Sequence, residues 1–161
     1  MNAAILTNEF PPEIYGGAGI HVKFLTQELS KLCHIEARCF GSQDVDEDNV
    51  RAIGFSRKLG LDPVDDRFQK IFKPLDINLQ WAATLKDIDV IHCHTWYSHF
   101  GGVLASRLLQ CPLILTTHSL EPHRPWKAEQ LGDGSFSFLI PASSSSCVTS
   151  NGKTTDSTNA P

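Results

Sequence analysis

Short apolar runs that alternate with amphipathic stretches are the main pattern along this chain. Five runs have the length and composition of strands: Ala3–Thr7, Val90–Cys93 and Leu113–Thr117, with weaker candidates at Ile35–Phe40 and Arg51–Phe55. Three stretches have helical spacing of apolar residues: Val22–Leu32, Ile77–Leu85 and His99–Leu109, the last of which Cys111-Pro112 ends. Because strands alternate with helices, the sequence predicts an α/β, Rossmann-like fold, a parallel sheet with helices on both faces.

The segments between these elements differ in character. Gln43–Val50 is acidic and polar, and we expect it to be a surface loop. Arg57–Pro74 is charged and carries several helix breakers, so it receives no assignment. From Ser135 onward the chain is rich in Ser, Thr and Asn, and such a composition buries too little apolar surface to offset its ordering entropy. The sequence therefore predicts one domain over residues 1–134 and a disordered tail over 135–161.

Composition narrows the class of protein. With 161 residues the chain is long enough for one domain with a core, and its formal net charge is −4. Lys and Arg form no run longer than two residues, which argues against nucleic acid or an acidic membrane surface as a partner. No secretory signal and no membrane-spanning apolar run is present, and five scattered cysteines are typical of reduced thiols. We expect a cytoplasmic protein.

A glycine cluster follows the first predicted strand. The strand leads into a Pro-broken loop, then Tyr15 and Gly16-Gly17-Ala18-Gly19, and then a helix. A helix N-terminus has unpaired N–H groups and a partial positive charge, and glycines let a phosphate approach both. The spacing fits neither the dinucleotide fingerprint nor a Walker A loop. We interpret Gly16, Gly17 and Gly19 as a phosphate contact, the alternative being a tight loop entry with close helix packing.

Two further loops are expected at the same sheet edge, where ligands of open parallel sheets bind. One contains His92-Cys93-His94-Thr95-Trp96-Tyr97, followed by His99. A metal site in this group is disfavoured, because no paired ligand motif completes it and Cys93 faces the other side. We expect His92 to be a packed strand residue, and His94 and Trp96 to line the crevice.

The other loop begins with His118, directly after the predicted strand Leu113–Thr117. Ser119, Glu121, His123 and Arg124 follow it. An imidazole at this position can donate to a sugar hydroxyl or stabilise developing charge, because its pKa is tunable near neutrality. A purely structural role is the alternative.

Three motifs together resemble bacterial glycogen synthases, and more broadly the retaining glycogen and starch synthase glycosyltransferases of the GT-B fold. They are Asn8-Glu9-Phe10-Pro11-Pro12 with Tyr15-Gly16-Gly17-Ala18-Gly19, the loop His92–Tyr97, and Thr117-His118-Ser119-Leu120-Glu121-Pro122 with Arg124-Pro125-Trp126-Lys127. The resemblance covers about residues 1–132 and stops near 134. Family members continue into a second Rossmann domain, so we expect a truncated or frame-shifted product that lacks this C-terminal domain.

The resemblance implies transfer of glucose from ADP-glucose or UDP-glucose to an α-1,4-glucan with retention of configuration, without a cofactor or a metal. It implies a catalytic role for His118 at the donor sugar and a diphosphate contact at Gly16, Gly17 and Gly19. It also implies an acceptor-side role for Trp96 and Tyr97. The other substrate-binding candidates are Tyr15, His94 and Glu121. The starch-synthase pattern has an Asp at the position of His94 or Thr95, where this chain departs from it.

The resemblance also implies that this hexosyltransferase chain is inactive alone. The family's basic pair, which neutralises the leaving diphosphate, lies in the second domain, and such stabilisation is typically the largest catalytic effect. Two alternatives stay open. One is a non-catalytic glucan- or nucleotide-binding module, and the other an interaction module that pairs with a separate C-terminal domain through Phe136, Phe138, Leu139 and Ile140. The choice between ADP- and UDP-glucose, and between a glucan and a maltose-phosphate product, also stays open.

Overall fold

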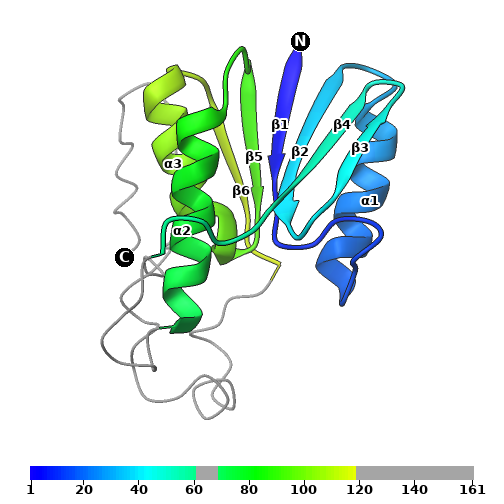
Figure 1. Ribbon diagram of the computed structural model, residues 1–161. Helices are drawn as coiled ribbons and strands as arrows, with labels where there is room; N and C mark the ends of the chain where they lie inside the picture. Colours follow the sequence, from blue (N-terminus) through cyan, green and yellow to red (C-terminus); the bar gives the residue numbers. More distant parts are fainter. Residues whose placement is uncertain (61–68, 119–161) are drawn as a thin grey trace, which may run out of the picture.

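The computed structural model describes residues 1–60 and 69–118, which form one sheet with a helical layer on each face (Figure 1). In chain order the elements are β1 (Asn2–Leu6), α1 (Gly17–Leu29), β2 (His34–Phe40), β3 (Asp44–Glu47), β4 (Val50–Phe55), α2 (Gln69–Thr84), β5 (Val90–His94), α3 (Trp96–Leu109) and β6 (Leu113–Thr116). The six-stranded sheet has the order β3-β4-β2-β1-β5-β6. All neighbouring strands are parallel except β3 and β4. The predicted tail over 135–161 lies outside the described residues.

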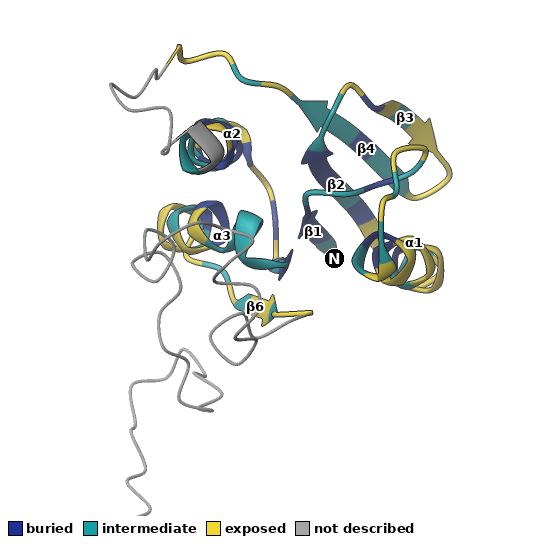
Figure 2. Cartoon of the chain, turned by 90° about the horizontal axis from the view of Figure 1, so that it is seen from below, coloured by how far each residue is buried: buried dark blue, intermediate teal, exposed yellow. Residues whose placement is uncertain are grey.

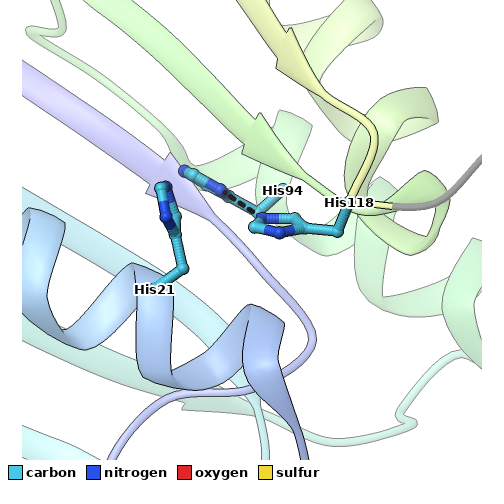
Figure 3. A group of neighbouring side chains, drawn as sticks. All are labelled: His21, His94 and His118. Carbon is cyan, nitrogen blue, oxygen red and sulfur yellow. Dashed lines mark hydrogen bonds between the residues drawn. The ribbon is translucent and has the colours of Figure 1, made fainter.

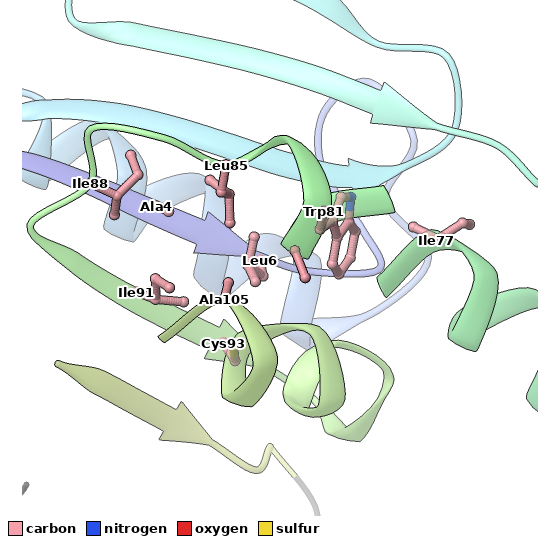
Figure 4. Packing of buried hydrophobic residues seen from close by; sticks show 10 residues of the cluster. Ala4, Leu6, Ile77, Trp81, Leu85, Ile88, Ile91, Cys93 and Ala105 are labelled. Carbon is pink, nitrogen blue, oxygen red and sulfur yellow. The ribbon is translucent and has the colours of Figure 1, made fainter. Parts of the chain in front are cut away.

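Alternation along β1 builds a core on each face of the sheet. Ala4 and Leu6 pack with Trp81 on the side of α2 and α3 (Figure 4). Ala3 and Ile5 face the other way, into the cluster that contains Val22 of α1. Figure 2 shows α1 on one side of the sheet, and α2 and α3 on the other. The predicted mostly parallel α/β fold with helices on both faces is confirmed, as are all five predicted strands.

The prediction of a loop over Gln43–Val50 is wrong, because Asp44–Glu47 forms the edge strand β3. This strand is antiparallel to β4, and Val45 packs against the core cluster on the α1 side. Arg51 of β4 pairs with two of its acidic side chains, Asp44 at 2.8 Å and Asp46 at 3.7 Å. Charged side chains are usual on an edge strand, where they oppose pairing with other chains.

Helix α2 begins eight residues before its predicted start, at Gln69, and has Pro74 inside it. A proline in a helix removes one hydrogen bond and normally breaks the helix, which is why the sequence did not predict this. Tertiary contacts override that local cost. The buried Asp76 carboxylate accepts hydrogen bonds from the Lys58 and Leu59 amides at 3.1 and 2.9 Å. Ile77 and Trp81, which lie about one and two turns after Pro74, are fully buried.

The other two helices also begin earlier than predicted, so that both start in candidate site loops. Helix α1 starts at Gly17, within the glycine cluster, and α3 starts at Trp96. Among the described residues, no helix has the length and apolar character needed to cross a membrane.

Candidate functional site

Histidines from three elements converge at the carboxyl edge of the sheet (Figure 3). His21 lies on α1, His94 ends β5, and His118 follows β6. The His94 Nδ1 and His118 Nε2 atoms are 3.0 Å apart. The ring centroid of His21 is 5.5 Å from that of His94 and 5.0 Å from that of His118. The predicted approach of the β5 and β6 loops is therefore present in the structure, and α1 adds a third imidazole to it.

Strand alternation explains why these rings meet on the α1 side of the sheet. Ile91 and Cys93 of β5 pack into the core on the side of α2 and α3, so His92 and His94 face α1. The register pairs His94 with Thr116, and His118 is two residues further along the same face. His92 lies beneath this group, 4.1 Å from the His94 ring and bonded through Nε2 to Thr116 Oγ1 at 2.8 Å. The expected packed role of His92 is confirmed.

Two rings of this group, His94 and His118, are uncharged at neutral pH because their pKa values are lowered. Burial, and then repulsion from the His92 and His118 rings, lowers the pKa of His94 to about 3. Burial also lowers the pKa of His118, with His21 adding to the effect and the Glu9 carboxylate opposing it. Neutral imidazoles have a free lone pair and one N–H group, so these rings can accept and donate hydrogen bonds.

His94 is fully buried, whereas the sequence analysis expected it to line the crevice. The His21 and His118 rings lie against it, and both of these residues are exposed. An external ligand therefore meets His21 and His118 first, and His94 supports them from below. The sequence analysis placed His94 and His118 at one crevice, but it did not predict that the His21 ring packs against both.

Glu9 organises the glycine cluster, and the sequence analysis did not select it. Its Oε2 atom accepts hydrogen bonds from the amides of Tyr15 and Gly16, each at 3.0 Å. A Cβ atom on Gly19 would lie 2.7 Å from the same oxygen, so a glycine is needed there for the loop to close on the carboxylate. A Glu in the loop seven residues before Gly16 is a weak signal that pointed to this role.

The Glu9 carboxylate binds some amides of the predicted phosphate loop and leaves others without an acceptor. The Gly16 amide is bonded to Glu9, while the first-turn amides of α1, on Gly17, Ala18 and Gly19, have no intrahelical acceptor. Gly17 is exposed, and nothing lies within 4 Å of the place where its Cβ atom would be. Tyr15 is 82% exposed beside it. The end of α1 is thus open to an anion at Gly17 rather than at Gly16.

Trp96 and Tyr97 are the first two residues of α3, and they follow His94 by two and three positions. Their rings stack at a centroid distance of 4.0 Å, and both residues are half-buried. Asn78 of α2 fixes this end of the helix, because its side chain bonds the Tyr97 carbonyl and the Gly101 amide. Asn78 was not predicted as a site residue. Glu121, the remaining candidate, lies outside the described residues.

Thr95, between β5 and α3, has a strained backbone with φ of 66° and ψ of 158°. Such values are rare for any residue but glycine, and a β-branched side chain makes them more costly. Its Oγ1 atom donates to Asn8 Oδ1 at 3.0 Å, and Asn8 in turn contacts the Glu9 carboxylate at 3.4 Å. The strained residue therefore connects the β5 loop to the glycine loop.

Two substitutions at Thr95 separate the strain from the hydrogen bond. Thr95→Ala and Thr95→Gly both remove the hydroxyl, but only glycine relieves the backbone. We expect Thr95→Gly to be more stable than Thr95→Ala by about 1 kcal/mol, the reverse of the usual order. Urea denaturation of both variants measures the difference. An alanine variant that is the more stable of the two would show that the strain is absent.

A pH dependence of stability is expected from His99, on the first turns of α3. Burial lowers its pKa, and a hydrogen bond with the Thr116 backbone opposes this only in part. Between the lowered folded pKa and about 6.5 the unfolded chain binds a proton that the folded chain does not, so stability falls as the pH drops below about 6.5. In His99→Gln we expect the slope from pH 7 to 5, measured by urea denaturation in EDTA, to flatten by up to about 1.4 kcal/mol per pH unit. An unchanged slope would contradict this.

Known proteins with a sequence similar to this chain are glycosyltransferases and sugar-phosphate synthases. A family described as Glycosyltransferase Family 4 matches residues 15–148. Alpha-maltose-1-phosphate synthases from Mycolicibacterium smegmatis and Mycobacterium tuberculosis are 41% identical over 134 residues, which is 83% of this chain and 32% of theirs. An uncharacterized glycosyltransferase from Methanocaldococcus jannaschii is 28% identical over 123 residues, 75% of this chain and 32% of its own.

A solved structure supports the fold. Sucrose-phosphate synthase from Thermosynechococcus elongatus superposes with a TM-score of 0.51 at 17% identity, over 84% of this chain and 36% of its own. The chain thus spans about a third of the length of the relatives it matches. The predicted resemblance is confirmed for the GT-B glycosyltransferase fold, but these relatives do not single out glycogen synthase. The chain belongs to glycosyltransferase family 4.

Proposed function

We propose that this chain is the acceptor-side domain of a retaining hexosyltransferase that moves glucose from a nucleotide-glucose donor to an α-glucosyl acceptor. The observation that carries the proposal is the shared position of the open α1 N-terminus and the exposed His118 at one sheet edge, joined by His21. A glycosyl donor of this class has a diphosphate next to a sugar. The first-turn amides of α1 suit the diphosphate, and His118 suits the sugar.

His118 has the chemistry that this role requires. As a neutral imidazole it can donate a hydrogen bond to a donor hydroxyl, and it can stabilise positive charge that develops on the sugar. The His94 ring, bonded to it at 3.0 Å, fixes its orientation. The stacked Trp96 and Tyr97 pair offers an aromatic surface of the kind on which sugar rings pack.

Two acceptors fit this proposal. The glycogen-synthase resemblance favours an α-1,4-glucan, whereas the relatives named for maltose 1-phosphate favour glucose 1-phosphate. The resemblance implies that the groups which neutralise the leaving diphosphate lie in a second domain, so we expect residues 1–161 alone to bind substrates without transferring glucose.

Calorimetric titration of the purified chain with ADP-glucose and UDP-glucose tests donor binding. We expect His118→Ala to weaken donor binding about three- to tenfold, the effect of losing one hydrogen bond. His34→Ala is the matched control, because His34 is an exposed histidine at the start of β2, where the amino ends of the parallel strands lie. Equal weakening in both variants, or none in His118→Ala, would contradict the assignment. Titration with glucose 1-phosphate and with maltooligosaccharides then separates the two acceptors.

A glucan-binding module without a donor site is the second candidate, favoured by the stacked Trp96 and Tyr97 pair. It would co-sediment with glycogen, lose this on Trp96→Ala, and bind neither nucleotide-glucose. Donor binding that depends on His118 would rule it out.

A further inference from the structure

The three converging imidazoles are close enough to hold one metal ion. Each of His21, His94 and His118 offers a ring nitrogen, and these nitrogens all lie within 4.8 Å of one another. Nitrogens bound to a tetrahedral zinc ion at about 2.0–2.1 Å are about 3.3 Å apart. The 3.0 Å separation of His94 Nδ1 and His118 Nε2 is already near this value. To bind one ion, the exposed His21 ring has to come closer, and the His94 and His118 rings have to turn so that both lone pairs face the ion.

The hydrogen bonding of the cluster leaves it incomplete without a further partner. Two neutral imidazoles that face each other share one proton, so one lone pair of the His94–His118 pair is used in this bond. The Nε2 atom of His94 is buried and has no hydrogen-bond partner among the described residues. A cation can bind His94 through this atom or through Nδ1, where it would replace the bond to His118. Only the first route uses a nitrogen that has no partner, and the second replaces an existing hydrogen bond.

The chemistry of the ligands selects the kind of ion. Imidazole nitrogens suit Zn²⁺, Cu²⁺, Ni²⁺ and Co²⁺, whereas Mg²⁺ and Ca²⁺ prefer oxygen ligands. The fully buried His94 forms the base of the site, and the exposed His21 and His118 leave a path for the ion from solvent. Three imidazoles with one open side match the zinc sites that keep a fourth position for water.

We propose that His21, His94 and His118 bind one divalent transition-metal ion, Zn²⁺ in the first instance, with a fourth coordination position open to solvent. The sequence analysis rejected a metal site made of His92, Cys93, His94 and His99. The proposed set shares only His94 with that group and takes its other two ligands from α1 and from the end of β6. The proposal does not depend on the glycosyltransferase function, since it concerns the metal alone.

Competition between the chain and a chromophoric zinc chelator tests the proposal, with a protein whose purification tag contains no histidine. We expect one equivalent of Zn²⁺ to bind saturably, and Mg²⁺ not to compete. His21→Gln and His118→Gln should each weaken Zn²⁺ binding by at least tenfold, while His34→Gln, an exposed histidine at the other sheet edge, should leave it unchanged. Both tested ligands are exposed, so their variants should keep the wild-type circular dichroism and melting temperature in EDTA.

A second measurement guards against binding by the cysteines. With Co²⁺ in place of zinc, the proposed site gives the absorption of a tetrahedral nitrogen- and oxygen-ligated ion, without the intense charge-transfer band of a thiolate. A thiolate band, zinc affinity that is unchanged in His21→Gln and His118→Gln, or no saturable uptake would each overturn the proposal. Donor titrations with nucleotide-glucose in EDTA are independent of all three outcomes.

Discussion

Asn78→Asp is expected to destabilise the fold by about 3 kcal/mol or more, although the two side chains have nearly the same shape. Asn78 is 1% exposed, and its amide group donates to the carbonyls of Pro74 at 2.6 Å and Tyr97 at 2.7 Å. Its Oδ1 atom accepts from the Gly101 amide at 2.5 Å. Aspartate keeps the acceptor but places a carboxylate oxygen against two buried carbonyls. We therefore expect the amino end of α3, with Trp96 and Tyr97, to detach from α2.

Urea denaturation of Asn78→Asp and Asn49→Asp measures this effect against a matched control. Asn49 makes the same kind of bond, from Nδ2 to the Ser30 carbonyl at 2.9 Å, but at an exposed site. There water can replace the lost bond, so we expect a cost below about 1 kcal/mol. Near-ultraviolet circular dichroism should change only in Asn78→Asp, because the aromatic pair lies beside that residue. Similar stability of the two variants would mean that Asn78 does not hold α3.

The five parallel strands could be predicted because they are short apolar runs, whereas the acidic edge strand β3 could not. The rule that ligands bind at the carboxyl ends of parallel strands placed the loops that carry His94 and His118 around one crevice. Their contact follows from strand register, which the alternation of β5 already fixes. The part of the site that depends on the pleat and on the carboxyl ends of the strands is therefore available from sequence.

The parts that could not be predicted depend on contacts between residues far apart in the chain. His21 meets His118 only because α1 is rotated with Val22 and Thr26 towards the sheet. Asn78 is on α2, the helix whose start could not be predicted because of Pro74, and it acts through contacts with residues on α3. Glu9 folds back on amides six and seven residues later, which no local pattern requires. Each is a polar side chain whose role is set by a neighbouring element rather than by its own periodicity.

Two departures from local rules lie next to the candidate site. Pro74 is inside α2, and Thr95 has a backbone conformation that favours glycine. The Pro74 carbonyl accepts a bond from Asn78, and the Thr95 hydroxyl bonds Asn8. Conflicts between local preference and fold are expected where a protein uses strain to position functional groups. Here Thr95 lies between β5 and α3, and Pro74 is connected through Asn78 to Tyr97 at the start of α3.

Gly102→Ala is expected to destabilise the fold by about 3 kcal/mol. Removal of the Cys93 sulfur atom should reverse much of this loss. A Cβ atom on Gly102 would overlap the Sγ atom of Cys93, which is fully buried in β5. This sulfur cannot move aside as the end of a flexible side chain would. Gly102 thus allows α3 to lie directly on β5, which places the end of that strand and His94.

A double-mutant cycle with Cys93→Ala tests whether this one contact sets the helix–strand distance. If it does, Gly102→Ala with Cys93→Ala should be more stable than the sum of the single changes by about 2 kcal/mol. Gly17→Ala is the matched control, since open space surrounds its Cβ position on α1, and it should be neutral or stabilising. Additive effects in the cycle would show that Gly102 is required by the backbone of α3 itself. A coupling of the expected size would show that Cys93 and Gly102 together determine how closely α3 packs beneath the candidate site.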